Sequence, residues 1–156
     1  MSRLAGEWLS GVGPGSAGSE QDWWGQRLGL PESGPDSVAG FGRRLVAYGV
    51  DSVLANLLAL SFTGPTEDAW GLAVLGAIAV QYLVFVGVFG QTVGMRLLGL
   101  RVALLTGRGA SPNVPGLGRS AVRTLLLVLF VPAIVWDADN RGFHDKAVGT
   151  AVLRTR

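Results

Sequence analysis

The 156-residue sequence contains no cysteine, and His144 and Lys146 are its only histidine and its only lysine. Without cysteine, disulfides, zinc–thiolate sites, iron–sulfur clusters and a thiol nucleophile are excluded. A lone histidine excludes a multi-histidine metal site, so we expect no metal and no cofactor. Charged residues are also scarce, at 15%, whereas 49% are hydrophobic; soluble domains carry about a quarter of charged residues. This balance indicates a membrane protein, and a net charge of +2 gives no reason to expect a nucleic-acid partner.

The first 40 residues are rich in glycine, serine and proline and contain no long apolar run. Such a composition cannot bury enough apolar surface to offset its chain entropy, so we expect residues 1–40 to be a disordered cytoplasmic tail without a signal peptide. Within it, Trp23 and Trp24 stand close to two leucines. Three interpretations stay open for them: an anchor at the membrane interface, a docking peptide for another protein, or part of the disordered tail.

Two long apolar runs follow and predict a membrane-spanning helical hairpin. They cover residues 45–63 and 69–90, and each is long enough for a hydrocarbon core of about 30 Å at about 1.5 Å per residue. A third run, residues 120–138, contains Pro132. Arg123 lies near its start and would have to snorkel to the interface if the run spans the membrane. The sequence leaves open whether this third helical segment spans the membrane or re-enters it.

The arginines are distributed unevenly. Residues 91–123 contain five arginines and no acid, whereas the charged residues of the turn between the first two runs are all acidic. By the positive-inside rule, the N-terminus and the 91–123 connection are cytoplasmic. A spanning third run would put the basic C-terminal residues outside, which favours a re-entrant hairpin or a third helix whose tail is drawn out despite its charge. Residues 100–109 and 149–156 mix β-branched residues with turn formers, and if they pair, both lie on the same side of the membrane, which is a second reason to place the C-terminus in the cytoplasm. The predicted fold is an all-α integral membrane protein with, at most, this one short strand pair.

Asp51 lies inside the first apolar run and is the strongest functional signal in the sequence. A carboxylate in hydrocarbon is costly, so it must face protein, water or a bound cation. Arg44 lies seven residues earlier on the same helix face, but about 10 Å of helical rise separates the two residues, which is too far for contact. Two interpretations remain: an ion, proton or ligand site, or a buried polar clamp between helices.

A polar segment follows the third run and contains His144 and Asp145. Adjacent residues on a helix do not face each other, and no nucleophile motif accompanies the pair, so we expect no enzymatic activity. We expect salt bridges to the arginines of the 91–123 connection instead. In that connection Arg96 and Arg101 flank leucines in an amphipathic pattern, which predicts an interfacial segment that binds anionic lipid headgroups or pairs with Asp145.

Three motifs, in this order, resemble those of the RDD family, small bacterial membrane proteins named for one arginine and two aspartates. The stretch "RRLVAYGVD" supplies Arg44 and Asp51, with Arg43 as the alternative to Arg44 for the arginine role. The stretch "NRGFHDKAVGTAV" supplies Asp145, and "GQTVGMRLLGLRV" is similar to the family's central segment. The resemblance spans residues 38–153.

The resemblance implies an RDD-like transmembrane domain over residues 41–156, located in the bacterial plasma membrane. Transport of a small ion or ligand has been suggested for the family, and Asp51 would then be the intramembrane polar site. Three helical segments are too few to enclose a pathway, so transport implies a homo-oligomer. The competing hypothesis is a non-transporting accessory or assembly subunit of a larger membrane complex, in which the charged residues hold the fold together.

Overall fold

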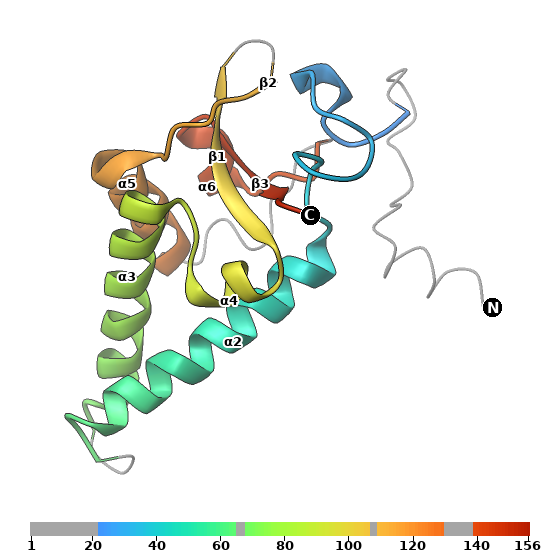
Figure 1. Cartoon of the computed structure of the whole chain (residues 1–156). Helices are drawn as coiled ribbons and strands as arrows, with labels where there is room; N and C mark the ends of the chain where they lie inside the picture. Colours follow the sequence, from blue (N-terminus) through green and yellow to red (C-terminus); the bar gives the residue numbers. More distant parts are fainter. Residues whose placement is uncertain (1–21, 65–67, 107–108, 130–138) are drawn as a thin grey trace.

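The structure, a computed structural model, describes residues 22–64, 68–106, 109–129 and 139–156. This part of the chain is mostly helical and contains a small three-stranded sheet with the strand order β2-β1-β3 (Figure 1). In chain order, the elements are η1 (Gln26–Leu28), α2 (Phe41–Leu60), α3 (Trp70–Phe89), α4 (Val93–Leu97), β1 (Leu100–Thr106), β2 (Gly109–Ala110), α5 (Gly116–Val128), α6 (Phe143–Ala147) and β3 (Thr150–Arg154). The fold is thus mostly helical as expected, and the sheet goes beyond the single strand pair of that prediction by the short strand β2.

The two long helices, α2 and α3, diverge from the turn that joins them and form a V in Figure 1. Among the described residues, only α3 is long and apolar enough to cross a membrane. α2 has the same length of 20 residues, but Arg43, Arg44 and Asp51 interrupt its apolar character. The predicted pair of spanning helices is therefore not confirmed; one candidate spanning helix is present.

β1 is the central strand and runs antiparallel to both neighbours. Its register with β3 runs from Leu100 opposite Arg154 to Leu104 opposite Thr150, which confirms the predicted pairing of the two stretches. Apolar side chains cover both faces of the β1–β3 pair. One face packs with the helices and the other with the N-terminal segment, because successive side chains of a strand point to opposite faces.

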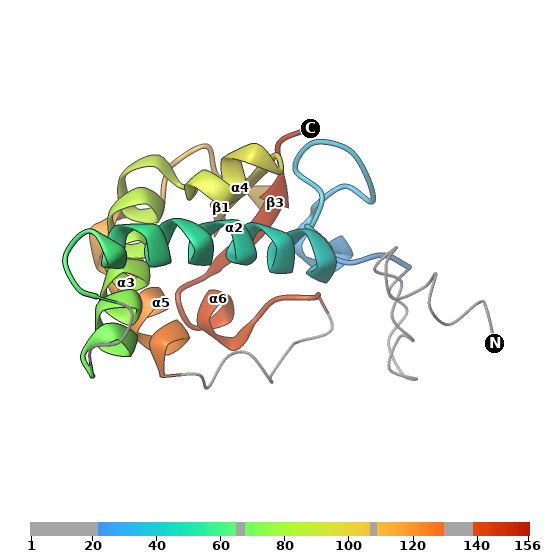
Figure 2. The same ribbon diagram turned by 90° about the horizontal axis from the view of Figure 1, so that it is seen from below.

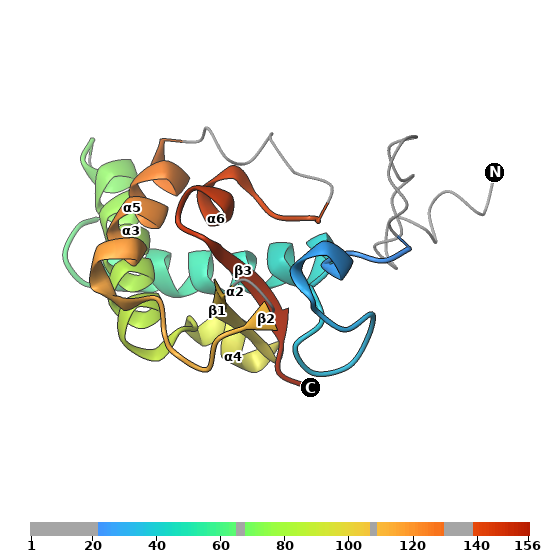
Figure 3. The same ribbon diagram turned by 90° about the horizontal axis from the view of Figure 1, so that it is seen from above.

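Residues 22–40 fold against the sheet, which differs from the expected disorder for this part of the tail. Val38 bridges Leu153 at the free edge of β3, and Leu30 is buried against the same sheet face. Trp23 Nε1 donates a hydrogen bond to the carbonyl of Leu30 over 3.0 Å, and Trp24 packs on the same cluster. Trp24 thus packs against the chain's own sheet, beside which the segment lies in Figure 3, whereas Trp23 is hydrogen-bonded within the segment itself. Residues 1–21 lie outside the described residues.

α5 contains the first part of the third apolar run. It begins at Gly116 and is 13 residues long, so it extends about 20 Å, which is less than a hydrocarbon core. The rest of the run, residues 130–138, lies outside the described residues. α5 buries Ser120, Arg123 and Thr124. Arg123 therefore points into the protein, and the condition that it snorkels to the interface, which a spanning third segment required, is not met. Figures 2 and 3 show α6, which follows, on the opposite side of β3 from α4.

Candidate functional site: two buried carboxylates

Asp51 and Asp145 are fully buried, with 0% of either residue exposed. Asp51 lies on the buried stripe of α2, which otherwise consists of small side chains: Ala47, Ala55 and Ala59. Because alanine is small, neighbouring elements approach the helix closely along this stripe. Asp145 lies on α6, and α5 and β3 pack against that short helix.

The Asp51 carboxylate accepts four hydrogen bonds. Oδ1 accepts from Gln81 Nε2 over 3.1 Å and from the backbone N–H of Gly94 over 2.8 Å. Oδ2 accepts from the hydroxyl of Tyr82 over 3.2 Å and from that of Thr92 over 2.5 Å. We call these five residues the Asp51 cluster. All four donors are neutral, and no cation of the described chain lies within ion-pair distance of the carboxylate.

The start of α4 explains how two of these donors reach Asp51. Thr92 is the N-cap of α4, and its hydroxyl accepts a hydrogen bond from Met95 N over 3.2 Å, so its own proton is directed to the carboxylate. Gly94 has no side chain. A Cβ atom there would collide with the carbonyl oxygen of Ala47 and lie 3.0 Å from Asp51 Cγ, so glycine is what lets α4 approach α2.

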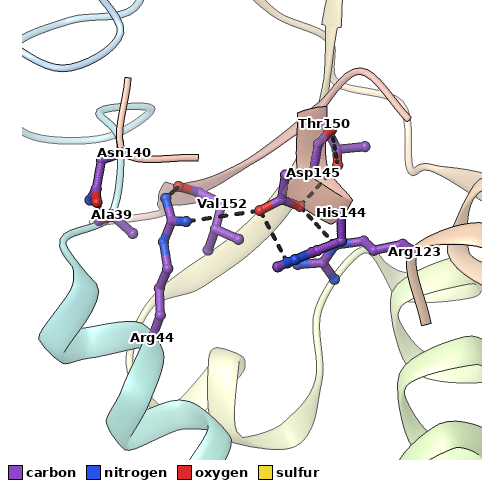
Figure 4. Close-up of polar contacts among 8 residues, drawn as sticks. All are labelled: Ala39, Arg44, Arg123, Asn140, His144, Asp145, Thr150 and Val152. Carbon is purple, nitrogen blue, oxygen red and sulfur yellow. Dashed lines mark hydrogen bonds and ion pairs between the residues drawn. The ribbon is translucent and has the colours of Figure 1, made fainter. Parts of the chain in front are cut away.

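Arg44 does not contact Asp51, as its helical spacing predicts. Its Nη1 lies 3.8 Å from Asp145 Oδ2 instead, and its Nη2 donates to the carbonyl of Val152 over 3.4 Å. Figure 4 shows Arg44 extending from α2 toward β3 and Asp145. The arginine at the start of α2 and the C-terminal aspartate of the motifs are thus brought together, while Asp51 belongs to a separate cluster.

Arg123 makes the shorter contact with Asp145. Its Nε donates to Oδ1 over 2.8 Å, and the Thr150 hydroxyl donates to the same oxygen over 3.0 Å. His144 Nε2 lies 3.5 Å from Oδ2. We call these residues, with Arg44, the Asp145 cluster (Figure 4). The salt bridge to an arginine of the 91–123 connection confirms that prediction.

The approach of His144 to Asp145 corrects the argument that adjacent helical residues stay apart. α6 has only five residues, and the imidazole folds back over Gly142, where a Cβ would lie 2.6 Å from His144 Cε1. Burial lowers the pKa of His144 to about 4; the positive charges of Arg123 and Arg44 act in the same direction and Asp145 opposes them. Burial by itself would raise the pKa of Asp145, but the charges of Arg123, His144 and Arg44 hold that pKa well below its ordinary value.

The remaining sequence candidates lie at the surface. Arg101 donates to Asp36 over 2.6 Å, so the alternative that it pairs with Asp145 is wrong. Arg96 is exposed on α4, and Arg43 is exposed in the first turn of α2. Between the two neighbouring arginines, it is therefore the second that enters the interior.

The sequence alone does not single out several residues of the two clusters as site residues: Gln81, Tyr82, Thr92, Gly94 and Thr150. Gln81 carries a sequence signal, since it is the one clearly polar residue of the second apolar run. The spacing of Gly90 and Gly94 is another, because small residues four apart permit close packing of helices. Thr150 has no such signal, since a threonine in a strand is ordinary.

Residues 38–149, which include Arg44, Asp51 and Asp145, match the family model described as the RDD family. No curated protein and no solved structure matches the chain.

Proposed function

The chain belongs to the RDD family, whose members are typically membrane-associated, and from this premise we propose that it is a multi-pass protein of the bacterial plasma membrane that takes part in transport of a small ion. In this proposal Asp51 takes up a proton or a small monovalent cation. Arg44 and Asp145 have a structural role, and the His144–Asp145 pair has no enzymatic one.

The outer surface of the helices supports membrane embedding. Large apolar side chains are exposed along α2, α3 and α5; Leu57, Phe89 and Leu125, one from each helix, are all more than half exposed. A soluble monomer rarely exposes so many neighbouring apolar groups. Acyl chains would remove them from water at no cost in polar contacts.

The sheet supports a hairpin of two spans. Ala39 N donates to the carbonyl of Val152 just before α2 begins, and Val102 N donates to the carbonyl of Gly90 just after α3 ends. Because both flanks attach to one sheet, α2 and α3 together leave and return to the same side of a bilayer. A sheet with unpaired backbone groups does not lie in hydrocarbon, and by the positive-inside rule its arginines support a cytoplasmic position for that side.

The same sheet supports a re-entrant third segment. β1 and β3 pair directly, so they lie on the same side of the bilayer. The chain between them, residues 107–149, must then cross either not at all or an even number of times. This favours the re-entrant interpretation over a single third span and keeps the C-terminus cytoplasmic.

The contrast between the two buried aspartates carries the functional part of the proposal. Asp145 forms ion pairs with two arginines, whereas the hydrogen-bond partners of Asp51 are all neutral. A buried charge without a counter-charge is costly. A proton or a cation bound at Asp51 would remove that cost, and Tyr82 and Thr92 would offer hydroxyl oxygens, which suit a hard cation such as Na⁺. Since few helices come from one chain, the pathway would form in a homo-oligomer.

Reconstitution into liposomes tests this proposal. With an imposed proton or sodium gradient, we expect Asp51→Asn to reduce ion flux at least about tenfold, while Asp36→Asn, which alters a half-exposed carboxylate outside the Asp51 cluster, leaves it unchanged. Asp51→Glu retains the charge and should retain part of the flux. Flux that is equal in the wild type, in Asp51→Asn and in protein-free liposomes would remove the transport role.

The second candidate, a non-transporting accessory subunit of a membrane complex, is favoured by one observation. Four hydrogen bonds already satisfy the Asp51 carboxylate, as a purely structural clamp would require. Affinity purification from native membranes tests this candidate. The informative truncation removes residues 1–21 only, since residues 22–40 pack on the sheet. A partner that co-purifies with the wild type and with Asp51→Asn alike, in the absence of flux, would favour this second function.

A further inference from the structure

We propose that Arg96 and Arg156 form a binding site for the phosphate of an anionic phospholipid headgroup at the surface of α4. The inference rests on the proposed membrane embedding and is independent of the role of Asp51.

The end of the chain is held beside α4. Arg156 Nη2 donates to the carbonyl of Leu97 over 3.0 Å, and Thr155 N donates to the carbonyl of Gly99 over 2.8 Å. Gly99 has φ +64°, and a Cβ there would lie 2.9 Å from Arg156 Cγ, so the side chain of Arg156 passes directly over this glycine. Figure 3 shows the C-terminus next to α4. The Arg156 guanidinium is therefore bonded to the backbone of Leu97, the residue that follows Arg96.

Apolar side chains are exposed in the same place. Leu97 is 62% exposed and Val93 is 36% exposed, and a spacing of four residues places them on one side of α4. Exposed apolar side chains beside arginines are the pattern of a segment at the membrane interface, where the apolar groups enter the acyl region and the cations stay at the phosphates.

The local charge is positive and has little compensation. The sequence contains no acid between residues 69 and 136 and none after Asp145. The nearest acids along the contacting elements are already engaged: Asp36 binds Arg101, and Asp51 is fully buried. Among the described residues, Arg96 has no acidic partner. Guanidinium groups bind phosphate oxygens in a planar, two-pronged geometry, so the complementary ligand is a phosphate ester at the bilayer surface.

Lipid titration of the purified full chain in dodecyl maltoside micelles tests the site. Dioleoylphosphatidylglycerol should raise the midpoint of thermal unfolding and remain bound in native mass spectra, whereas dioleoylphosphatidylcholine should do neither. The double variant Arg96→Gln/Arg156→Gln should bind phosphatidylglycerol about tenfold more weakly or worse, as expected for the loss of two interfacial arginines. Inorganic phosphate at millimolar concentration should not reproduce the stabilisation.

Arg27→Gln/Arg119→Gln is the matched control, because it removes the same charge from two exposed arginines on η1 and α5. It should bind phosphatidylglycerol like the wild type. Equal losses in both double variants, or equal binding of both lipids by the wild type, would overturn the site. Alkaline carbonate extraction separates this failure from that of the proposed function. Release of the wild-type protein from membranes would contradict the embedding. Retention of the wild type, together with unchanged phosphatidylglycerol binding by Arg96→Gln/Arg156→Gln, would contradict only the headgroup site.

Discussion

The backbone N–H of Gly94 donates a hydrogen bond to Asp51 Oδ1 over 2.8 Å, so the first turn of α4 is tied to a carboxylate in the middle of α2. The contact requires that two backbones approach closely, since Gly94 lies directly against the carbonyl of Ala47. The polar cluster and the close packing of α4 on α2 therefore depend on each other.

Gly94→Ala should destabilise the protein because the added methyl meets backbone atoms of α2, which cannot move away without shifting the helix. Overpacking of this kind costs about 1–3 kcal/mol, and the hydrogen bond to Asp51 would lengthen as well. Thermal unfolding of the detergent-solubilised protein measures the loss. Gly49→Ala is the control on α2, since a Cβ there meets nothing within 4 Å; it should be neutral or stabilising. Equal stability of the two variants would contradict the packing argument.

Arg123→Met should be strongly destabilising because it leaves the Asp145 carboxylate buried without its closest cation. Breaking one side of a buried ion pair costs about 3–5 kcal/mol. Arg101→Met removes the partner of Asp36, which is half exposed, and should cost at most about 1 kcal/mol.

A double-mutant cycle decides whether Arg123 and Asp145 act as a pair. Arg123→Met/Asp145→Leu should cost clearly less than the sum of the two single variants, since the double variant leaves no unpaired charge. Unfolding free energies from denaturant titration supply the four values. Additive losses would mean that each residue is stabilised by other groups.

The predictable part of this fold is the part that depends on local pattern. The long helices follow from the apolar runs, and the pairing of residues 100–109 with 149–156 follows from their β-branched residues and turn formers. The burial of Asp51 follows from the cost of a carboxylate in an apolar run. The partners of Asp51 do not, because Tyr82 and Thr92 reach it only through the way α3 and α4 turn back onto α2. Tyr82 and Thr92 lie 31 and 41 residues from Asp51 in the sequence, so no local sequence pattern indicates these contacts.

Residues 22–40 show a second limit. Their composition predicts disorder, yet Leu30 and Val38, together with Trp24 and Leu28, cover one face of the sheet that β1 and β3 form. Arg123 shows a third, since an arginine at the start of an apolar run looks like an interfacial residue until Asp145 is brought near it by α6. In each case tertiary contact outweighs the local signal.

Acidification should destabilise the protein through His144. Its folded-state pKa of about 4 lies below the ordinary value of 6.5, so between these values the unfolded chain binds more protons and stability falls as pH falls from about 6.5 to 4. The loss reaches roughly 3 kcal/mol at the lower end. Asp145, whose pKa is also lowered, adds a further loss only below its ordinary value of 3.8.

Unfolding free energies measured between pH 4 and 7.5 check this dependence. In His144→Gln the slope between pH 4.5 and 6.5 should largely disappear, because no group in the Asp145 cluster then titrates in that window. A wild-type protein of constant stability across the window, or a variant with the same slope, would show that His144 is not buried in its neutral form.

Thr92 links the N-cap of α4 to the carboxylate, and its two roles are separable by substitution. Thr92→Val retains the shape of the side chain but removes the hydroxyl that accepts from Met95 and donates to Asp51. Loss of the helix cap costs about 0.5–2 kcal/mol of stability. The Asp51 oxygen that loses its donor adds a further cost. Thr92→Ser retains both hydrogen bonds and should be close to the wild type in thermal unfolding. In an Asp51→Asn background, Thr92→Val should lower stability less than in the wild type, because the carboxylate that would lose its hydrogen-bond donor is no longer present. An equal cost in both backgrounds would mean that Thr92 acts only as a helix cap, and that the 2.5 Å contact with Asp51 contributes nothing to the attachment of α4.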